Sequence, residues 1–131
     1  MGNAGLLMVK GIGIDIIEIE RIREAAGKYG DSFLEKVYTE KELKYCRDRK
    51  ALRYPELAVR FAAKEAFAKA IGTGIKGFGR RNNGVNWKDI EIINNSHGKP
   101  LISFQGKCSE KVQVSLSHSR DYAIASVYVE E

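Results

Sequence analysis

The sequence of 131 residues has few cysteines, no long hydrophobic run and no recognisable targeting segment. Cys46 and Cys108 form no CxxC pair, and we expect two reduced structural thiols rather than a disulfide. Nothing approaches the roughly 18 consecutive apolar residues of a membrane-spanning helix, so no membrane association is expected. The first residues lack the basic start and long apolar stretch of a signal peptide. These absences predict a cytoplasmic protein.

The chain also lacks a basic tail, an RNA-binding aromatic motif, an internal repeat and a proline-rich linker. Its net charge is +5, but 17 acidic residues are dispersed among 22 basic ones, so nucleic acid is not an expected partner. A basic protein of this kind suits acidic proteins or phosphorylated small molecules instead. We predict one domain over residues 1–131, with residues 1–7 as a flexible N-terminal extension.

Hydrophobic periodicity, capping residues and turn residues divide the chain into one strand, several helices and then several strands. The predicted strands cover residues 8–17, 88–94, 101–104, 112–117 and 122–129. The predicted helices cover residues 18–29, 32–37, 40–50, 55–71 and 107–111. This order indicates an α+β fold in which helices pack on an antiparallel sheet.

Asp15 stands out because it lies in the apolar, β-branched segment 11–17 (GIGIDII). Aspartate is depleted in strands and an unpaired buried charge is costly, so a positive partner should meet this carboxylate. The side chain also suits Mg²⁺, which prefers one or two carboxylates together with water and phosphate oxygens. The alternative is a charge at the end of a strand that points to solvent.

A second carboxylate, Glu65, lies among small and aromatic residues in the helical segment 60–70 (RFAAKEAFAKA). Glu65 and Lys69 are four residues apart and share a face, so they can bind a metal and contact a phosphate together. The alternative is an ordinary surface salt bridge. Arg60 and Lys64 form a second row with the same spacing, which we expect to be available for phosphate or an acidic partner.

The glycine-rich segment 72–77 (GTGIKG) matches the GxGxxG pattern of dinucleotide-binding proteins letter by letter. That fingerprint requires a preceding strand and a following helix N-terminus, whereas here the glycines follow a predicted helix. We therefore reject a nucleotide-dependent oxidoreductase. The segment fits a chain reversal that lets the backbone approach a ligand, or simply a mobile loop.

Residues 114–121 (VSLSHSRD) bring serine, histidine and aspartate together, as in a hydrolase triad. Adjacent strand residues point to opposite faces, so Ser117 and His118 cannot easily form the hydrogen bond that a triad needs. His118 is instead a candidate for binding a nucleotide or phosphate. His97 lies in a turn next to Gly98, where we expect a solvated histidine.

The first predicted helix carries three basic residues, Arg21, Arg23 and Lys28. Such charges usually form a solvated face. Their functional interpretation is a docking surface for an acidic protein, since complementary charge speeds encounter and sets orientation.

Together these segments resemble the holo-acyl-carrier-protein synthase family, the small phosphopantetheinyl transferases. The matching segments are, in the family's order and spacing, 11–16 (GIGIDI), 60–75 (RFAAKEAFAKAIGTGI), 87–92 (WKDIEI), 98–100 (GKP) and 114–119 (VSLSHS). The resemblance covers roughly residues 8–129. It implies the α+β fold of that family and the transfer of 4′-phosphopantetheine from coenzyme A to a serine of apo acyl carrier protein. The implied by-product is adenosine 3′,5′-bisphosphate, and the implied pathway is fatty acid biosynthesis.

The resemblance also implies roles for individual residues. Asp15 and Glu65 would be the Mg²⁺ ligands, and Lys69 would contact the phosphates and support the leaving group, so these three are the implied catalytic residues. His118 would bind the nucleotide part of coenzyme A, and Arg21 would meet the acidic carrier protein. The further implied coenzyme A contacts are Arg60, Lys64, Lys69 and Gly72.

Family members typically assemble as homotrimers with active sites between subunits. A trimer would also cover apolar residues that we expect to be exposed on the last strands, namely Leu116, Ile124, Val127 and Val129. The chemistry fits the residues independently, because phosphoryl-type transfer needs charge neutralisation and positioning more than an enzyme nucleophile. The competing interpretation is a basic domain that binds nucleotides or acidic proteins without catalysis.

Overall fold

The computed structural model describes residues 8–75 and 84–131. The predictions for residues 1–7, and for the part of the glycine-rich connection within 76–83, lie outside the described residues. The elements run in the order β1 (Val9–Glu18), α1 (Ile19–Tyr29), α2 (Asp31–Val37), α3 (Glu40–Tyr45), β2 (Arg47–Asp48), β3 (Ala51–Leu52), α4 (Tyr54–Ile71), η1 (Trp87–Asp89), β4 (Ile90–Asn94), β5 (Pro100–Phe104), β6 (Lys107–Cys108), β7 (Val112–His118) and β8 (Tyr122–Glu130).

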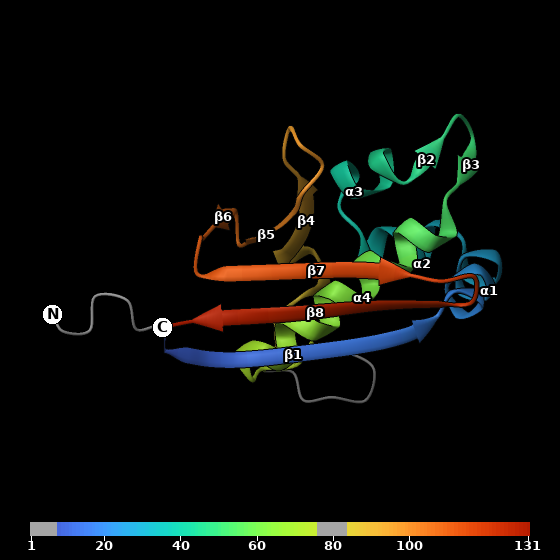
Figure 1. Cartoon of the computed structure of the whole chain (residues 1–131). Helices are drawn as coiled ribbons and strands as arrows, with labels where there is room; N and C mark the ends of the chain where they lie inside the picture. Colours follow the sequence, from blue (N-terminus) through green and yellow to red (C-terminus); the bar gives the residue numbers. More distant parts are fainter. Residues whose placement is uncertain (1–7, 76–83) are drawn as a thin grey trace, which may run out of the picture.

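Within the described residues the strands form three antiparallel sheets, which confirms the predicted α+β class (Figure 1). The largest has the order β1-β8-β7, the second has the order β4-β5-β6, and β2 and β3 form a short hairpin. The chain's first long strand and its last therefore lie side by side, with Asp15 opposite Ala125. Among the described residues, no helix is both long and apolar enough to cross a membrane.

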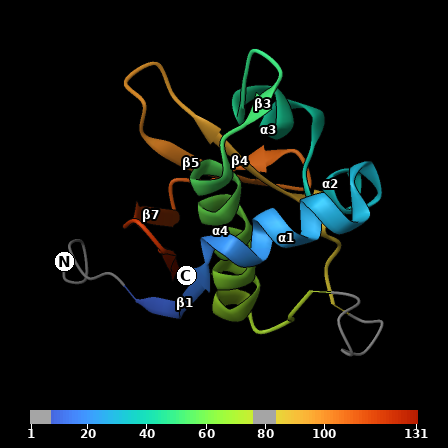
Figure 2. The ribbon, with the colours of Figure 1, turned by 90° about the vertical axis from the view of Figure 1, so that its right-hand side faces the viewer.

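Helix α4 is the centre of the core, and α1 crosses it on one side (Figure 2). Helix α4 has Pro55 in its first turn and ends at Ile71, and the capping residue Gly72 has a φ of 80°, the left-handed conformation common after helices. Its many alanines let the main sheet and the smaller helices approach closely, and 11 of its 18 residues are buried. A helix covered on most of its sides is held by packing rather than by an amphipathic surface.

Two predicted helices need correction. The helix predicted over 40–50 ends at Tyr45, and the chain then forms the β2–β3 hairpin, in which Arg49 has a left-handed φ of 60°. The segment predicted as a helix over 107–111 contains strand β6, which pairs with β5. The remaining predicted elements are present, with 3₁₀ helix η1 replacing the start of the strand predicted over 88–94.

The exposed apolar face lies on another strand than expected. Val127 and Val129 are buried in the core, and Leu116 and Ile124 are partly covered. In β1 the residues alternate, so Gly11, Gly13 and Asp15 belong to the face toward α4 while Ile12, Ile14 and Ile16 belong to the opposite face. These three isoleucines are 56–66% exposed, and Tyr122 of β8 is 50% exposed on the same face.

Candidate functional site

Four of the predicted site residues line one pocket of about 370 Å³. Asp15 comes from β1, Arg21 from α1, and Glu65 and Lys69 from α4. The other described residues that line this pocket are apolar, namely Ile16, Ile17, Ile22, Ala25, Phe33 and Phe61. The pocket thus combines two carboxylates and two cations with a mostly apolar wall, which is the usual character of a ligand site.

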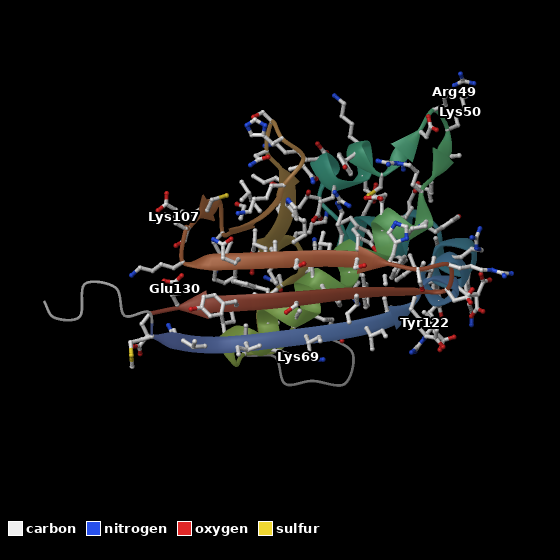
Figure 3. The ribbon with its side chains drawn as sticks, in the orientation of Figure 1. Arg49, Lys50, Lys69, Lys107, Tyr122 and Glu130 are labelled. Carbon is white, nitrogen blue, oxygen red and sulfur yellow. The ribbon has the colours of Figure 1, made fainter. Side chains whose placement is uncertain are left out.

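Asp15 has the positive partner that its setting predicted. The Nζ atom of Lys69 lies 3.0 Å from Oδ1 of Asp15 and also donates a 3.0 Å hydrogen bond to the carbonyl oxygen of Ile14. The Asp15 side chain is 18% exposed and the Lys69 side chain is 45% exposed, so the pair lies at the mouth of the pocket. Figure 3 shows Lys69 beside β1.

Two glycines bring β1 close enough to α4 to build this pocket. A Cβ atom on Gly13 would lie 1.8 Å from the carbonyl oxygen of Ala66, and one on Gly11 would lie 1.9 Å from that of Ala70. Only a residue without a side chain allows this approach. Asp15 is the next residue on that face of β1, and it lines one pocket together with Glu65 and Lys69 of α4.

The donor set fits Mg²⁺ better than a metal held entirely by protein. No group of three or more histidine, cysteine, aspartate or glutamate side chains that could hold a metal exists in the part of the chain that the structure describes. Asp15 and Glu65 supply two carboxylates to one pocket, and Mg²⁺ is usually bound by one or two carboxylates with water and substrate phosphates. These residues can therefore hold Mg²⁺ when a phosphorylated ligand completes the shell.

His118 lies in a different pocket, of about 750 Å³, at the end of β7. Three basic residues also line this pocket. Arg23 comes from α1, Lys50 from the β2–β3 hairpin and Arg53 from the position directly before α4. The guanidinium of Arg23 stacks 4.5 Å from the ring centre of Tyr54, which also lines it. The structure thus separates His118 from Asp15 and Glu65 within one chain, and α1 contributes Arg21 to one pocket and Arg23 to the other.

Sequence reasoning did not place Arg23 and Arg53 in a pocket. The sequence pattern assigns Arg23 to the docking surface on the first helix, and it predicts neither an element nor a role for residues 51–54. The available signal was the density of basic residues in segment 47–53 (RDRKALR), directly before the long helix. Figure 3 shows Arg49 and Lys50 at the tip of this hairpin.

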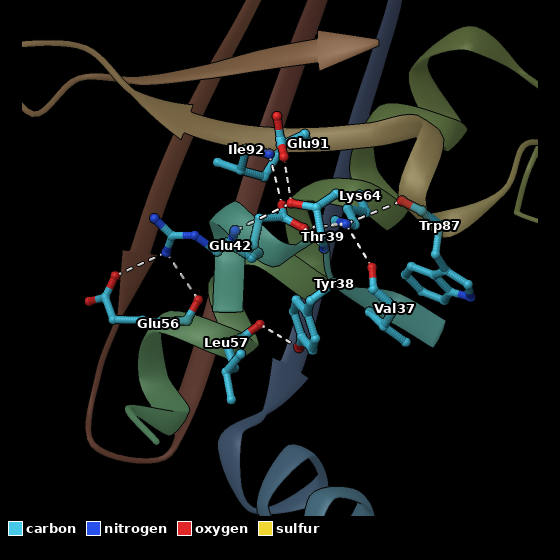
Figure 4. A network of polar contacts seen from close by, with 11 residues as sticks. Val37, Tyr38, Thr39, Glu42, Glu56, Leu57, Lys64, Trp87, Glu91 and Ile92 are labelled. Atoms are coloured by element: carbon cyan, nitrogen blue, oxygen red, sulfur yellow. Dashed lines mark hydrogen bonds and ion pairs between the residues drawn. The ribbon is translucent and has the colours of Figure 1, made fainter. Parts of the chain in front are cut away.

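Lys64 does not belong to an accessible basic row, which corrects the expectation for it. Its side chain is fully buried, and Nζ lies 2.6 Å from Oε1 of Glu42 while donating to the carbonyl oxygens of Val37 and Trp87 at 2.7 and 3.1 Å (Figure 4). Burial lowers the pKa of Lys64, and the nearby Glu42 carboxylate opposes that shift. All three ammonium donors have partners, so this lysine ties the segments around α4 together rather than facing a ligand.

Arg60 is similarly enclosed, with 1% of its side chain exposed. Its Nη1 binds the carboxylate of Glu56 at 3.1 Å, its Nη2 binds Oδ1 of Asn94 at 2.9 Å, and its guanidinium lies 4.2 Å from the ring centre of Tyr45. The expectation of an accessible Arg60 therefore also needs correction. Gly72, in contrast, is exposed one turn beyond the pocket lysine.

Comparison with known proteins gives a consistent result. A family model described as the 4′-phosphopantetheinyl transferase superfamily matches residues 11–127. The holo-(acyl-carrier-protein) synthase of Chloroherpeton thalassium is 46% identical, with 91% of this chain and 96% of that protein aligned. That of Koribacter versatilis is 42% identical, with 95% and 100% aligned.

Solved structures agree with the sequence comparisons. A holo-(acyl-carrier-protein) synthase from Bacillus anthracis, in complex with CoA (3′,5′-ADP), has a TM-score of 0.74 and 42% identity, covering 95% of this chain and 98% of that one. The holo-(acyl-carrier-protein) synthase from Neisseria meningitidis has a TM-score of 0.78 and 35% identity, covering 95% and 100%. These similarities confirm the fold that the sequence motifs implied.

Proposed function

The chain belongs to the 4′-phosphopantetheinyl transferase superfamily, and on that premise we propose how its residues carry out the reaction of its relatives. It transfers 4′-phosphopantetheine from coenzyme A to a serine of apo acyl carrier protein and releases adenosine 3′,5′-bisphosphate. The observation that carries the assignment of residues is the pocket shared by Asp15, Arg21, Glu65 and Lys69.

In this proposal Asp15 and Glu65 hold Mg²⁺, and all three of Asp15, Glu65 and Lys69 are catalytic residues. When bound, the metal supplies positive charge that neutralises the pyrophosphate oxygens of coenzyme A. Lys69 contacts the same phosphates with its exposed ammonium and stabilises the charge that develops on the leaving group. Because phosphoryl-type transfer relies on positioning and charge neutralisation, the carrier's serine can be the nucleophile without a covalent enzyme intermediate.

Coenzyme A is a polyanion, and basic side chains line both pockets. We assign the nucleotide part to the pocket of His118, where Arg23 and Arg53 supply charge and Tyr54 supplies an aromatic face. Gly72 offers an exposed backbone near the phosphates.

Arg60 and Lys64 have a supporting role in this proposal. Both are enclosed in the interior, so they hold the walls of the site rather than contact the coenzyme.

The carrier protein docks, in this proposal, on the basic side of α1. Arg21 is exposed and also lines the pocket of Asp15 and Lys69. An acidic partner that contacts Arg21 therefore brings its serine close to Lys69. Opposite charges orient such an encounter more than they add affinity.

We further propose a single-domain, cytoplasmic enzyme of fatty acid biosynthesis that assembles as a homotrimer with active sites between subunits. The support within the structure is the exposed face of Ile12, Ile14, Ile16 and Tyr122. Contiguous exposed apolar residues of this kind mark interaction surfaces. A trimer also lets the His118 pocket of one copy meet the Asp15 pocket of another, since one chain holds them apart.

The decisive experiment incubates the purified chain with coenzyme A, Mg²⁺ and an apo acyl carrier protein, and weighs the carrier by mass spectrometry. We expect a mass gain of one phosphopantetheine group, and its loss when a chelator removes the metal. A carrier or nucleotide that binds without any mass gain would favour the non-catalytic binding domain. Transfer that persists in the chelator would contradict the metal assignment while leaving the transferase activity intact.

A further inference from the structure

In this structure Lys69 occupies the carboxylate that the metal requires. Its ammonium lies 3.0 Å from Oδ1 of Asp15, and the same ammonium binds the carbonyl oxygen of Ile14 at 3.0 Å. A cation that reaches Asp15 from the pocket must therefore compete with a cation already bound there.

The contact is held more firmly than an ordinary surface ion pair. An exposed lysine paired with one carboxylate gains little, because it must order a long side chain against screening by water. Here the ammonium joins two acceptors on consecutive residues of β1, and Asp15 is only 18% exposed. The close approach of α4 to β1 at Gly13 fixes the distance between the helix that carries Lys69 and the strand that carries both acceptors.

We propose that Lys69 acts as a placeholder for the metal at Asp15 and thereby couples coenzyme A binding to metal binding. This inference rests on the proposed function, since it takes Asp15 as a metal ligand and the coenzyme's phosphates as alternative partners for Lys69. Without coenzyme A, the ammonium neutralises Asp15 and keeps metal affinity low. When the phosphates enter, the ammonium turns to them and Asp15 becomes free for the metal.

Linkage makes the coupling reciprocal. If coenzyme A raises metal affinity by releasing Asp15, the metal raises coenzyme A affinity by the same factor. A variant that lacks the ammonium should bind metal more tightly without coenzyme A, and its coupling should be weaker than in the wild type because only the direct contact of the phosphates with the metal then remains. The proposal therefore predicts a change in metal affinity that can be measured without turnover. Such a measurement distinguishes the placeholder role of Lys69 from its role in transfer.

The test measures Mn²⁺ binding to the full chain by electron paramagnetic resonance of free Mn²⁺, with and without coenzyme A and without carrier protein. We expect Lys69→Met to bind Mn²⁺ about tenfold more tightly than the wild type when coenzyme A is absent, within the usual range of coupling between sites. Coenzyme A should tighten Mn²⁺ binding in the wild type by a larger factor than in the variant, after correction for Mn²⁺ held by free coenzyme A.

The matched control is Arg21→Met, which removes one positive charge from the same pocket. It should tighten Mn²⁺ binding far less than Lys69→Met, and circular dichroism establishes that each variant is folded. Lys69→Gln provides a second uncharged variant with the same expected result.

Equal Mn²⁺ affinity in Lys69→Met and Arg21→Met, or undiminished coupling in Lys69→Met, would overturn the proposal. If the wild type binds no Mn²⁺ even with coenzyme A, the placeholder fails together with the metal site. The carrier mass assay then still decides separately whether the chain is a transferase.

Discussion

Gly13 lies directly against Ala66, so that a Cβ atom at Gly13 would fall 1.8 Å from the Ala66 carbonyl oxygen. The next residue on that face of β1 is Asp15, and α4 carries Glu65 immediately before Ala66. The absence of a side chain at Gly13 therefore lets the strand that carries Asp15 approach the helix that carries Glu65, and both residues line one pocket. The same contact between β1 and α4 thus packs the core and shapes the pocket that holds the candidate metal ligands.

Gly13→Ala should destabilise the fold and impair transfer, because the obstacle is helix backbone and cannot turn aside. Overpacking in a core typically costs 1–3 kcal/mol, and we expect about 3 kcal/mol or more of unfolding free energy here. Urea unfolding measures it. Gly27→Ala is the matched control, since a Cβ there meets nothing within 4 Å in helix α1. It should stabilise by about 0.5–1 kcal/mol. Equal stability of Gly13→Ala and the wild type would contradict the close approach.

Asp15→Asn and Glu65→Gln should each lower the transfer rate by about 10³-fold while the protein remains folded, because each removes a charge that the metal needs. The carrier mass assay measures the rate at saturating coenzyme A. Asp121→Asn changes an exposed aspartate outside the pocket and should leave the rate unchanged. Near wild-type rates in Asp15→Asn or Glu65→Gln would reject that residue as a metal ligand.

Several features could be predicted from the sequence because they depend on local patterns or on the family resemblance. A carboxylate in a β-branched strand requires a partner, and the structure supplies Lys69. The capping box of Thr39 and Glu42, a local sequence signal for the start of a helix, is present at the start of α3. These features depend on residues close in sequence or on one strong physical penalty.

What the sequence did not predict depends on contacts between distant segments. Lys64 has the spacing of a surface lysine, but α2, α3 and η1 cover it and supply its partners. The hairpin after Tyr45 is polar and charged like a helix end, and its turn places Arg49 in the left-handed conformation, which no sequence pattern of this segment indicates. The pocket of His118 lies between α1, this hairpin and the end of β7, so no single segment of the sequence contains the residues that line it.

Lys64→Met should destabilise the protein by about 3–5 kcal/mol, because it leaves the buried Glu42 carboxylate without its cation. Chemical denaturation measures the loss. Lys88→Met, which changes an exposed lysine of η1, should stay within about 0.5 kcal/mol of the wild type. A loss in Lys64→Met no larger than in Lys88→Met would show that the buried pair contributes little.

Stability should fall as the pH rises from about 9 to 11, because burial raises the pKa of the Cys46 thiol from 9.0 to about 11. In this range the unfolded chain releases the thiol proton while the folded protein keeps it, so rising pH favours unfolding, by roughly 2 kcal/mol. Burial also raises the pKa of Tyr38, which acts in the same direction above pH 10.

Urea midpoints at several alkaline pH values measure this decline. Cys46→Ala should make it shallower, whereas Cys108→Ala, which changes an exposed cysteine, should keep the wild-type slope. Identical slopes in all three proteins would show that the Cys46 thiol does not titrate differently on folding.

Ile12→Glu should dissociate the proposed trimer, because it places a charge on the exposed face of β1, where Ile12 is 66% exposed. Desolvating that charge in an interface is costly, and we expect the association constant to fall by at least about tenfold. Sedimentation at micromolar concentration measures the assembly. Tyr29→Glu is the matched control, since Tyr29 is 57% exposed on α1 and should leave the assembly intact. If Ile12→Glu dissociates without losing transfer activity, the active site is complete within one chain. A wild-type protein that sediments as a monomer would instead contradict the trimer, and the isoleucine face would then need another partner.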